Sequence, residues 1–178
     1  ANLTNLTSLN LSSCKSLQNV DVLATLTNLT SLNLNNCHSL QNADSLANLT
    51  KLTSLDLWGC HSLSNIDGLA KLVNLISLNL TYCSSLQNVN GLANLINLTT
   101  LNLSGCDFLQ NIDVLAKLIN LISLDLRYCS YLQNVKGLVN LTNLARLDLS
   151  DCDKVKPMLS QSWEDWDRVS GISRTYRK

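Results

Sequence analysis

The apolar positions of this chain recur in blocks of 23 residues. In the first block they are Leu6, Leu9, Leu11, Cys14, Leu17, Val20, Leu23 and Leu26. The triplet at 9–11 alternates apolar and polar residues, which predicts a short strand with one buried face. The other apolar positions advance by three residues, which predicts a tight coil around a leucine-filled interior, with one or two helical turns over 21–26. Positions within a block are numbered below from Leu6 as position one.

Cysteine marks position nine of every block. The seven cysteines are Cys14, Cys37, Cys60, Cys83, Cys106, Cys129 and Cys152, each 23 residues after the last. One block cannot enclose a core, but stacked blocks share one and pair their strands in parallel. We therefore predict one repeat array over residues 1–156, followed by a C-terminal capping helix and a basic tail over 157–178. Trp163, Trp166 and Val169 would share one face of that helix.

The cysteines also bear on chemistry and compartment. An odd number of cysteines cannot form a fully paired disulfide framework. Neighbouring sulfurs would lie roughly 5 Å apart, which is inside disulfide reach, so the count and not the distance argues against pairing. Zinc needs ligands that converge on one point, whereas these lie along a line. We interpret all seven as reduced thiols that face the leucine core and react only after unfolding, which fits a reducing compartment.

The spacing Leu6-x-x-Leu9-x-Leu11-x-x-Cys14-x-x-Leu17 resembles the signature of leucine-rich repeat proteins, with Cys where many members carry Asn. The match covers residues 3 to about 156. The phrase LANLINL at 92–98 resembles bacterial internalin-type repeats, and the cysteine resembles repeats of F-box proteins and some plant immune receptors. The resemblance implies an α/β repeat solenoid: a horseshoe with a parallel β-sheet on the concave face, short helical turns on the convex face, and a use in binding proteins.

Charge and composition exclude several function classes. The chain has 13 basic and 13 acidic residues, so it lacks the basic excess of a nucleic-acid binder. No apolar run reaches the roughly 18 residues of a membrane span. No catalytic triad order, carboxylate pair or phosphate-binding loop appears, so we expect no enzymatic activity and no cofactor. His38 and His61 would stack about 5 Å apart, and we read them as surface histidines and not as metal ligands.

Asn-x-Ser/Thr sequences are frequent, and in a eukaryotic secretory pathway many would accept glycans. We read them as a by-product of Asn placed before a structural Leu. Glycans on the predicted strand face would crowd it. The chain is therefore expected to be cytoplasmic, or bacterial in origin.

Differences between the copies predict the binding surface. Positions seven and eight, at the strand exit, carry large side chains in some copies, and Trp, Tyr and Arg are the types that dominate interface energetics. The candidate partner-binding residues are Trp58, Tyr82, Arg127 and Tyr128, joined by Arg146 from position three, by Asp56 and Asp125 on the strand face, and by Phe108 and Tyr131 on the adjoining loop. The alternative is a set of incidental surface aromatics in a repeat that has drifted.

Other positions are interpreted structurally. The Ser, Thr, Asn and Asp residues at positions three and five are expected to hydrogen-bond along the stack, and Asn19 and its equivalents to accept a backbone N–H at the helical turn. A strip of apolar residues brackets the turn into the strand; it consists of Val73, Ile76, Ile96, Ile119 and Ile122. Two interpretations of this strip remain open, namely partial burial within the turn and self-association.

These observations favour a non-enzymatic leucine-rich-repeat module that recognises a protein or peptide through its concave face and the adjacent rim. The close similarity of the copies supports a rival hypothesis, a structural or engineered repeat scaffold without a dedicated ligand. A further alternative is the sensor fragment of a larger immune receptor, effector or ubiquitin ligase.

Overall fold

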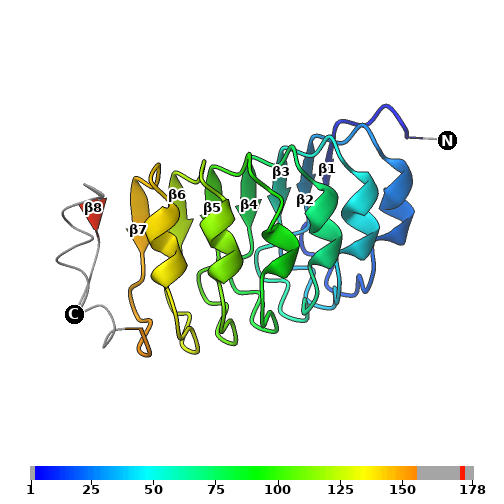
Figure 1. Cartoon of the computed structure of the whole chain (residues 1–178). Coiled ribbons are helices and arrows are strands. Elements are labelled where there is room, and N and C mark those ends of the chain that lie inside the picture. The colour runs from blue at the N-terminus through cyan, green and yellow to red at the C-terminus, as the bar shows by residue number, and fades with distance from the viewer. Residues whose placement is uncertain (1–2, 156–172, 175–178) are drawn as a thin grey trace.

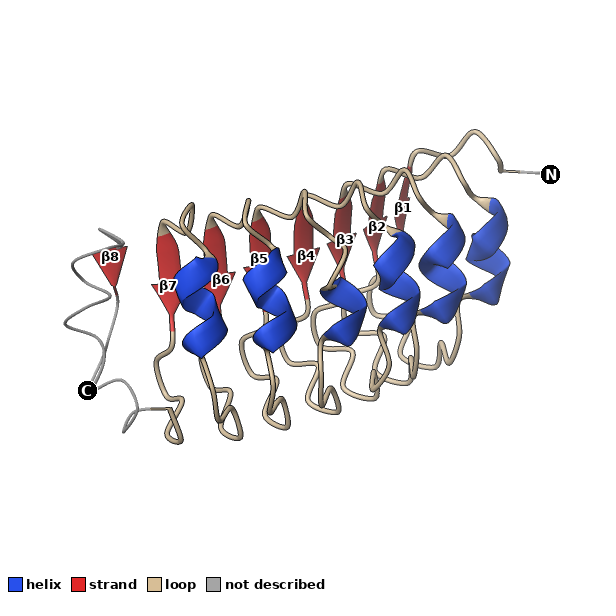
Figure 2. Ribbon diagram, viewed as in Figure 1, coloured by secondary structure: helices blue, strands red, loops and turns tan. Residues whose placement is uncertain are grey.

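A computed structural model describes residues 3–155 and 173–174 of the chain. Short strands alternate with short 3₁₀ helices in the order β1 (Ser8–Asn10), η1 (Asp21–Thr25), β2 (Ser31–Asn33), η2 (Asp44–Asn48), β3 (Ser54–Asp56), η3 (Asp67–Lys71), β4 (Ser77–Asn79), η4 (Asn90–Leu92), β5 (Thr100–Asn102), η5 (Asp113–Lys117), β6 (Ser123–Asp125), η6 (Lys136–Asn140), β7 (Arg146–Asp148) and β8 (Ser173–Arg174). The strands form one layer and the helices a second layer that faces it (Figures 1 and 2).

All neighbouring strands pair in parallel, in the order of the sequence. The register between β1 and β7 is one repeat throughout, so that Ser8 lies against Ser31 and Leu9 against Leu32. Each position of the repeat therefore lies beside the same position of the next coil. The predicted parallel solenoid, with strands on its concave face and helical turns on its convex face, is confirmed. The predicted capping helix lies outside the described residues, whereas β8, within the predicted basic tail, is a strand that the sequence did not reveal.

The core consists of the apolar positions that set the period. In the third coil Leu52, Leu55, Leu57, Cys60, Leu63, Ile66, Leu69 and Leu72 are all at most 2% exposed. The first coil is different, because Leu6, Leu9, Leu11 and Leu17 are only partly buried. Within the described residues this coil is covered by a neighbour on one side only. Each coil therefore depends on its neighbours for the burial of its leucines.

An asparagine initiates each helical turn, as predicted. The N–H of Asp21 donates to Oδ1 of Asn19, and the same bond recurs at Asn42, Asn65, Asn88, Asn111 and Asn134, with lengths of 2.7–3.4 Å. The asparagine lies one residue before the N-cap, so the bond closes a local Asx turn. The helices are 3₁₀ because apolar residues every three positions place one buried side chain on each turn of three residues.

The structure places six of the seven cysteines in the core as free thiols, from Cys37 to Cys152. Each of these Sγ atoms donates to the position-six carbonyl of the preceding coil at 2.9–3.3 Å. Cys14 is exposed. The prediction that all seven face the core is therefore wrong for Cys14, which belongs to the half-covered first coil. Burial raises the pKa of both Cys60 and Cys106 to about 12.

Hydrogen bonds along the stack come from residues that the sequence did not single out. At position 23 the amide Nδ2 of Asn97 donates to the carbonyl of Val73 at 2.9 Å. Equivalent bonds link Asn28, Asn74, Asn120 and Asn143 to the preceding coil. The residues at position five instead accept from the backbone N–H of position seven in their own coil, at 2.8–3.1 Å. The expected bonding of position five along the stack is corrected to a bond within the coil.

Candidate functional site

The large side chains at positions seven and eight lie directly beyond the ends of β3, β4 and β6. Trp58 and Arg127 occupy position seven, and Tyr82 and Tyr128 occupy position eight. All four are exposed. Because equivalent positions stack one coil spacing apart, roughly 4.8 Å, these residues form one edge of the concave face. This edge, defined by Trp58, Tyr82, Arg127 and Tyr128, is called the exit rim below.

The backbone of position eight has an unusual conformation in every coil. Its φ lies between 57° and 71° at Ser13, Asn36, Gly59, Tyr82, Gly105, Tyr128 and Asp151. This left-handed region is costly for a residue as bulky as tyrosine. It is imposed by the turn, because the N–H of position eight donates to the position-seven carbonyl of the next coil at 2.6–3.0 Å. The bond from position seven to position five fixes the other N–H of the turn, so Tyr82 and Tyr128 project from a held backbone.

The ring of Tyr82 lies over the backbone of Gly105 in the next coil. A Cβ placed on Gly105 would lie 2.3 Å from Cδ1 and 2.6 Å from Cε1 of that ring. Gly59 has the same relationship to Asn36, whose Oδ1 would lie 2.7 Å from an added Cβ. In both pairs the side chain at position eight reaches along the stack and covers a glycine. Gly105 therefore provides the surface on which Tyr82 rests.

The acidic residues of the predicted site are engaged by their own coils. Asp125 accepts from the backbone N–H of Arg127 at 3.0 Å, and its Oδ2 accepts from Nη2 of the same residue at 2.7 Å. This hydrogen bonding, with the charges of Asp125 and Asp148, raises the pKa of Arg127. Asp56 accepts from the backbone N–H of Trp58 at 3.0 Å. Asp56 and Asp125 thus shape the turns that carry the rim, and Arg127 is held by an ion pair.

The remaining predicted site residues fall into two groups. Arg146 is the first residue of β7, at the strand entry, roughly 13 Å of extended chain from position seven of the same coil, so the structure separates it from the exit rim. Phe108 and Tyr131 stack on the adjoining loop with ring centroids 5.4 Å apart. Nζ of Lys154 lies 4.1 Å from the centre of the Tyr131 ring. This loop pair forms a second aromatic surface that carries its own cation.

The loop histidines lie as predicted. The ring centroids of His38 and His61 are 4.9 Å apart. Nδ1 of His61 lies 3.0 Å from the carbonyl oxygen of Tyr82, so this loop contacts the backbone of the exit rim. Within residues 3–155 and 173–174, no group of three or more His, Cys, Asp or Glu residues is arranged to hold a metal ion. Over the same residues, no helix has the length and apolar character needed to cross a membrane.

Sequence reasoning missed the left-handed turn and the cation above Tyr131. The turn has a signal in the sequence, since Ser, Asn, Gly and Asp fill position eight in five of seven copies and are the residues that favour such turns. The contact with Lys154 has none, because position eleven is Ser in the first four copies. Its partner was visible only once the coils were stacked.

Two family models match the chain. One describes leucine-rich repeats in two copies and matches residues 27–71. The other describes a BspA-type leucine-rich repeat region in six copies and matches residues 60–162, more than half of the chain. No curated protein sequence matches.

Similar solved structures include two internalins of Listeria monocytogenes. Internalin C2 is 26% identical over 98% of this chain and 82% of its own, with a TM-score of 0.65. A second internalin, inlF, is 25% identical over 84% of this chain, with a TM-score of 0.58, and the match spans only 49% of that protein. The repeat period, the stacked coils and these matches agree, and the chain belongs to the leucine-rich repeat family.

Proposed function

We propose that this chain is a non-enzymatic binding module that recognises a protein or peptide through the exit rim and the adjoining concave face. The observation that carries the proposal is the held backbone beneath exposed aromatic residues at Tyr82 and Tyr128. Leucine-rich repeats commonly mediate protein–protein interaction, and nothing in the described residues assembles a catalytic constellation.

Preorganisation supports this use of the rim. Binding costs free energy for every side chain and loop that must be ordered, so a rigid surface gives up less affinity on association. The Tyr82 ring already rests on Gly105, and Arg127 is already paired with Asp125. Aromatic and Arg side chains on such a surface are the types enriched at interface hot spots. A partner would find these groups in fixed positions.

A selection experiment tests the proposal. A random peptide display library is selected on the immobilised chain, and the affinities of the recovered peptides are measured by calorimetry. Replacing Trp58 and Tyr128 with alanine should each weaken binding by about 2 kcal/mol or more if they are hot spots. Val139→Thr is the matched control, because Val139 is also an exposed apolar residue but lies on η6.

The rival hypothesis of a repeat scaffold without a ligand makes the opposite forecast. It expects no peptide to be enriched, or peptides that bind the Trp58→Ala, Tyr128→Ala double variant as well as the unmodified chain. Either result would remove the exit rim as a binding site.

A further inference from the structure

A strip of aliphatic side chains is exposed at the strand entry, at the opposite end of the strands from the exit rim. It comprises Val73, Ile76, Ile96, Ile119 and Ile122, which are 43–53% exposed. They lie on three successive turns, namely 73–76, 96–99 and 119–122. The structure thus favours an open apolar surface over burial within the turn. The neighbouring turns at 50–53 and 142–145 carry Thr and Ala at the same positions, so the strip has defined ends.

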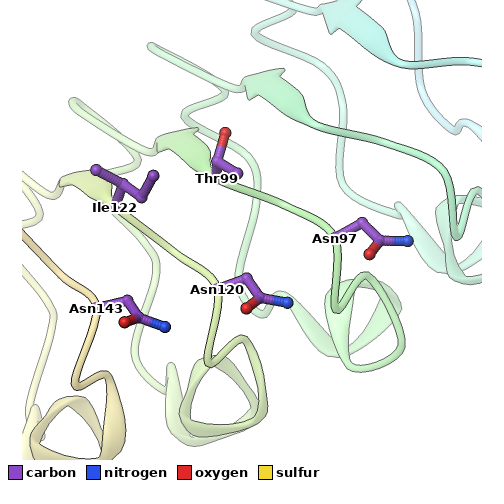
Figure 3. Close-up of a pocket in the computed structure, with 5 residues that line it drawn as sticks. All are labelled: Asn97, Thr99, Asn120, Ile122 and Asn143. Carbon is purple, nitrogen blue, oxygen red and sulfur yellow. The ribbon is translucent and has the colours of Figure 1, made fainter.

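The strip is rigid and its polar atoms are satisfied. Between its apolar residues lie Asn74, Asn97 and Asn120, and each amide donates to the backbone carbonyl of the preceding turn at 2.8–2.9 Å. Figure 3 shows Asn97, Asn120 and Asn143 in a row on successive coils, with Thr99 and Ile122 beside them at the strand entry. These five residues line a depression of about 500 Å³. Covering this surface would not leave the amides without partners.

Comparison of the copies shows what the apolar residues replace. At position two, Thr30, Thr53 and Thr99 each donate a hydroxyl hydrogen bond to the carbonyl of the preceding coil, at 3.0–3.2 Å. Ile76 and Ile122 stand at this position in other coils and forgo that bond. Each replacement gives up an internal hydrogen bond and adds exposed carbon. In the isolated chain neither change stabilises the fold, which points to a surface that is covered by something else.

The area of the strip suits a two-fold dimer. The exposed parts of the five side chains add up to about 400 Å², in the upper half of the range for the largest apolar patch on a monomer. Interfaces are about 60% apolar, so a strip of this size implies about 650 Å² buried on each partner. Two copies would then bury about 1,300 Å² in total, within the standard range for specific interfaces.

A second copy of the chain matches this surface in spacing and charge. The apolar turns recur at one coil spacing, about 4.8 Å, so the ridges of one strip have the same period as the gaps of another. The strip contains no charged side chain, and the whole chain carries formal net charge zero, so long-range repulsion between copies is small. A symmetric contact places the same patch on both subunits.

We propose that this strip is the contact surface of a homodimer. Because the strip lies at the strand entry and the exit rim lies beyond the strand ends, both rims stay accessible in the dimer. The dimer would then present two copies of the exit rim to a partner. A partner with two binding sites would be bound with avidity.

Sedimentation velocity over about 5 to 500 μM tests the dimer. The sedimentation coefficient should rise with concentration for the unmodified chain. The double variant Ile96→Asn, Ile119→Asn should associate at least tenfold more weakly. The matched control Val22→Asn, Val139→Asn removes two residues that are 79% and 54% exposed but lie outside the strip, and it should associate normally. Urea unfolding of each variant shows whether the fold is retained.

Three results would overturn the proposal. The first is a monomer over the whole concentration range, and the second is association that survives the strip substitutions. The third is flotation of monomeric chain with phosphatidylcholine–phosphatidylserine vesicles that is lost in the strip variant, which would assign the strip to a lipid surface. The variant Trp58→Ala, Tyr128→Ala should dimerise normally, so failure of the exit-rim proposal and failure of the dimer are distinguishable.

Discussion

Gly105→Ala tests whether the chain's own backbone positions the Tyr82 ring. The substitution has two effects in the structure. An alanine at φ 71° is strained by about 1–2 kcal/mol, and its Cβ would lie 2.3 Å from Cδ1 of Tyr82. The ring cannot escape by rotating about its own axis, because Cγ, which lies on that axis, would be only 3.3 Å from the new Cβ. Tyr82 must leave its rotamer, at a further cost of about 1 kcal/mol.

Gly59→Ala is the matched control for the backbone strain. Its φ is 69°, and the nearest atom to the added Cβ is Oδ1 of Asn36, the end of a flexible side chain that can swing away. We therefore expect a loss of about 1–2 kcal/mol for Gly59→Ala and about 2–3 kcal/mol for Gly105→Ala. Tyr82→Ser should restore about 1 kcal/mol to Gly105→Ala, because serine occupies the same left-handed position at Ser13.

Urea unfolding followed by circular dichroism measures these losses in a double-mutant cycle. Nuclear Overhauser contacts between the Tyr82 ring and the Gly105 Hα atoms report the ring position directly, and they should disappear in Gly105→Ala. Equal losses for the two glycine variants, together with zero coupling between Tyr82 and Gly105, would refute the idea that Gly105 positions the ring. If peptides selected on the exit rim exist, Gly105→Ala should weaken them in parallel with Tyr82→Ala.

Three further predictions concern the thiols and the asparagine ladder. One cysteine, Cys14, should react with a thiol reagent in the native chain, and the six buried cysteines only on unfolding; rapid labelling of all seven would contradict their burial. The raised pKa values of Cys60 and Cys106 favour the folded state fully below the unfolded value of 9.0, so the free energy of unfolding should fall by about 1.4 kcal/mol per thiol and pH unit from pH 9 towards 12, and less steeply in Cys→Ala variants. Asn120→Ala should lower the free energy of unfolding by about 1 kcal/mol, whereas Asn48→Ala, which removes no hydrogen bond, should have little effect.

The fold could be predicted because the constraint that sets it is periodic. A leucine that is 0% exposed must be apolar in every coil, so the core is written seven times at fixed spacing. Leu55 and Leu57 alternate with polar residues because a strand buries one face, and the steps of three follow from the 3₁₀ turns. The same reasoning placed the helix-initiating asparagines. It failed at Cys14, because the sequence pattern of the first coil does not show that its neighbours cover only one side.

The candidate site could be predicted only in part, for a physical reason. Exposure of Trp58, Tyr82 and Tyr128 follows from their positions at the strand exit. The direction of each side chain depends on the backbone angle of position eight and on which residue stands one coil later. Nothing local to Tyr82 in the sequence indicates that its ring rests on a glycine 23 residues away. The pairing of Arg127 with Asp125 was likewise missed, because the two residues were read as separate contacts for a partner.

The way the exit turn is held explains why variation concentrates there. Position five accepts the N–H of position seven, and the carbonyl of the next coil accepts the N–H of position eight, so both bonds use the backbone of the turn. Neither bond depends on the side chains at positions seven and eight, apart from the glycines that lie beneath a neighbour. Trp58, Thr81 and Arg127 can therefore occupy equivalent places without a change in the coil. A surface whose backbone is fixed independently of its side chains can change its specificity while the leucine core stays constant, which is the property that a binding rim requires.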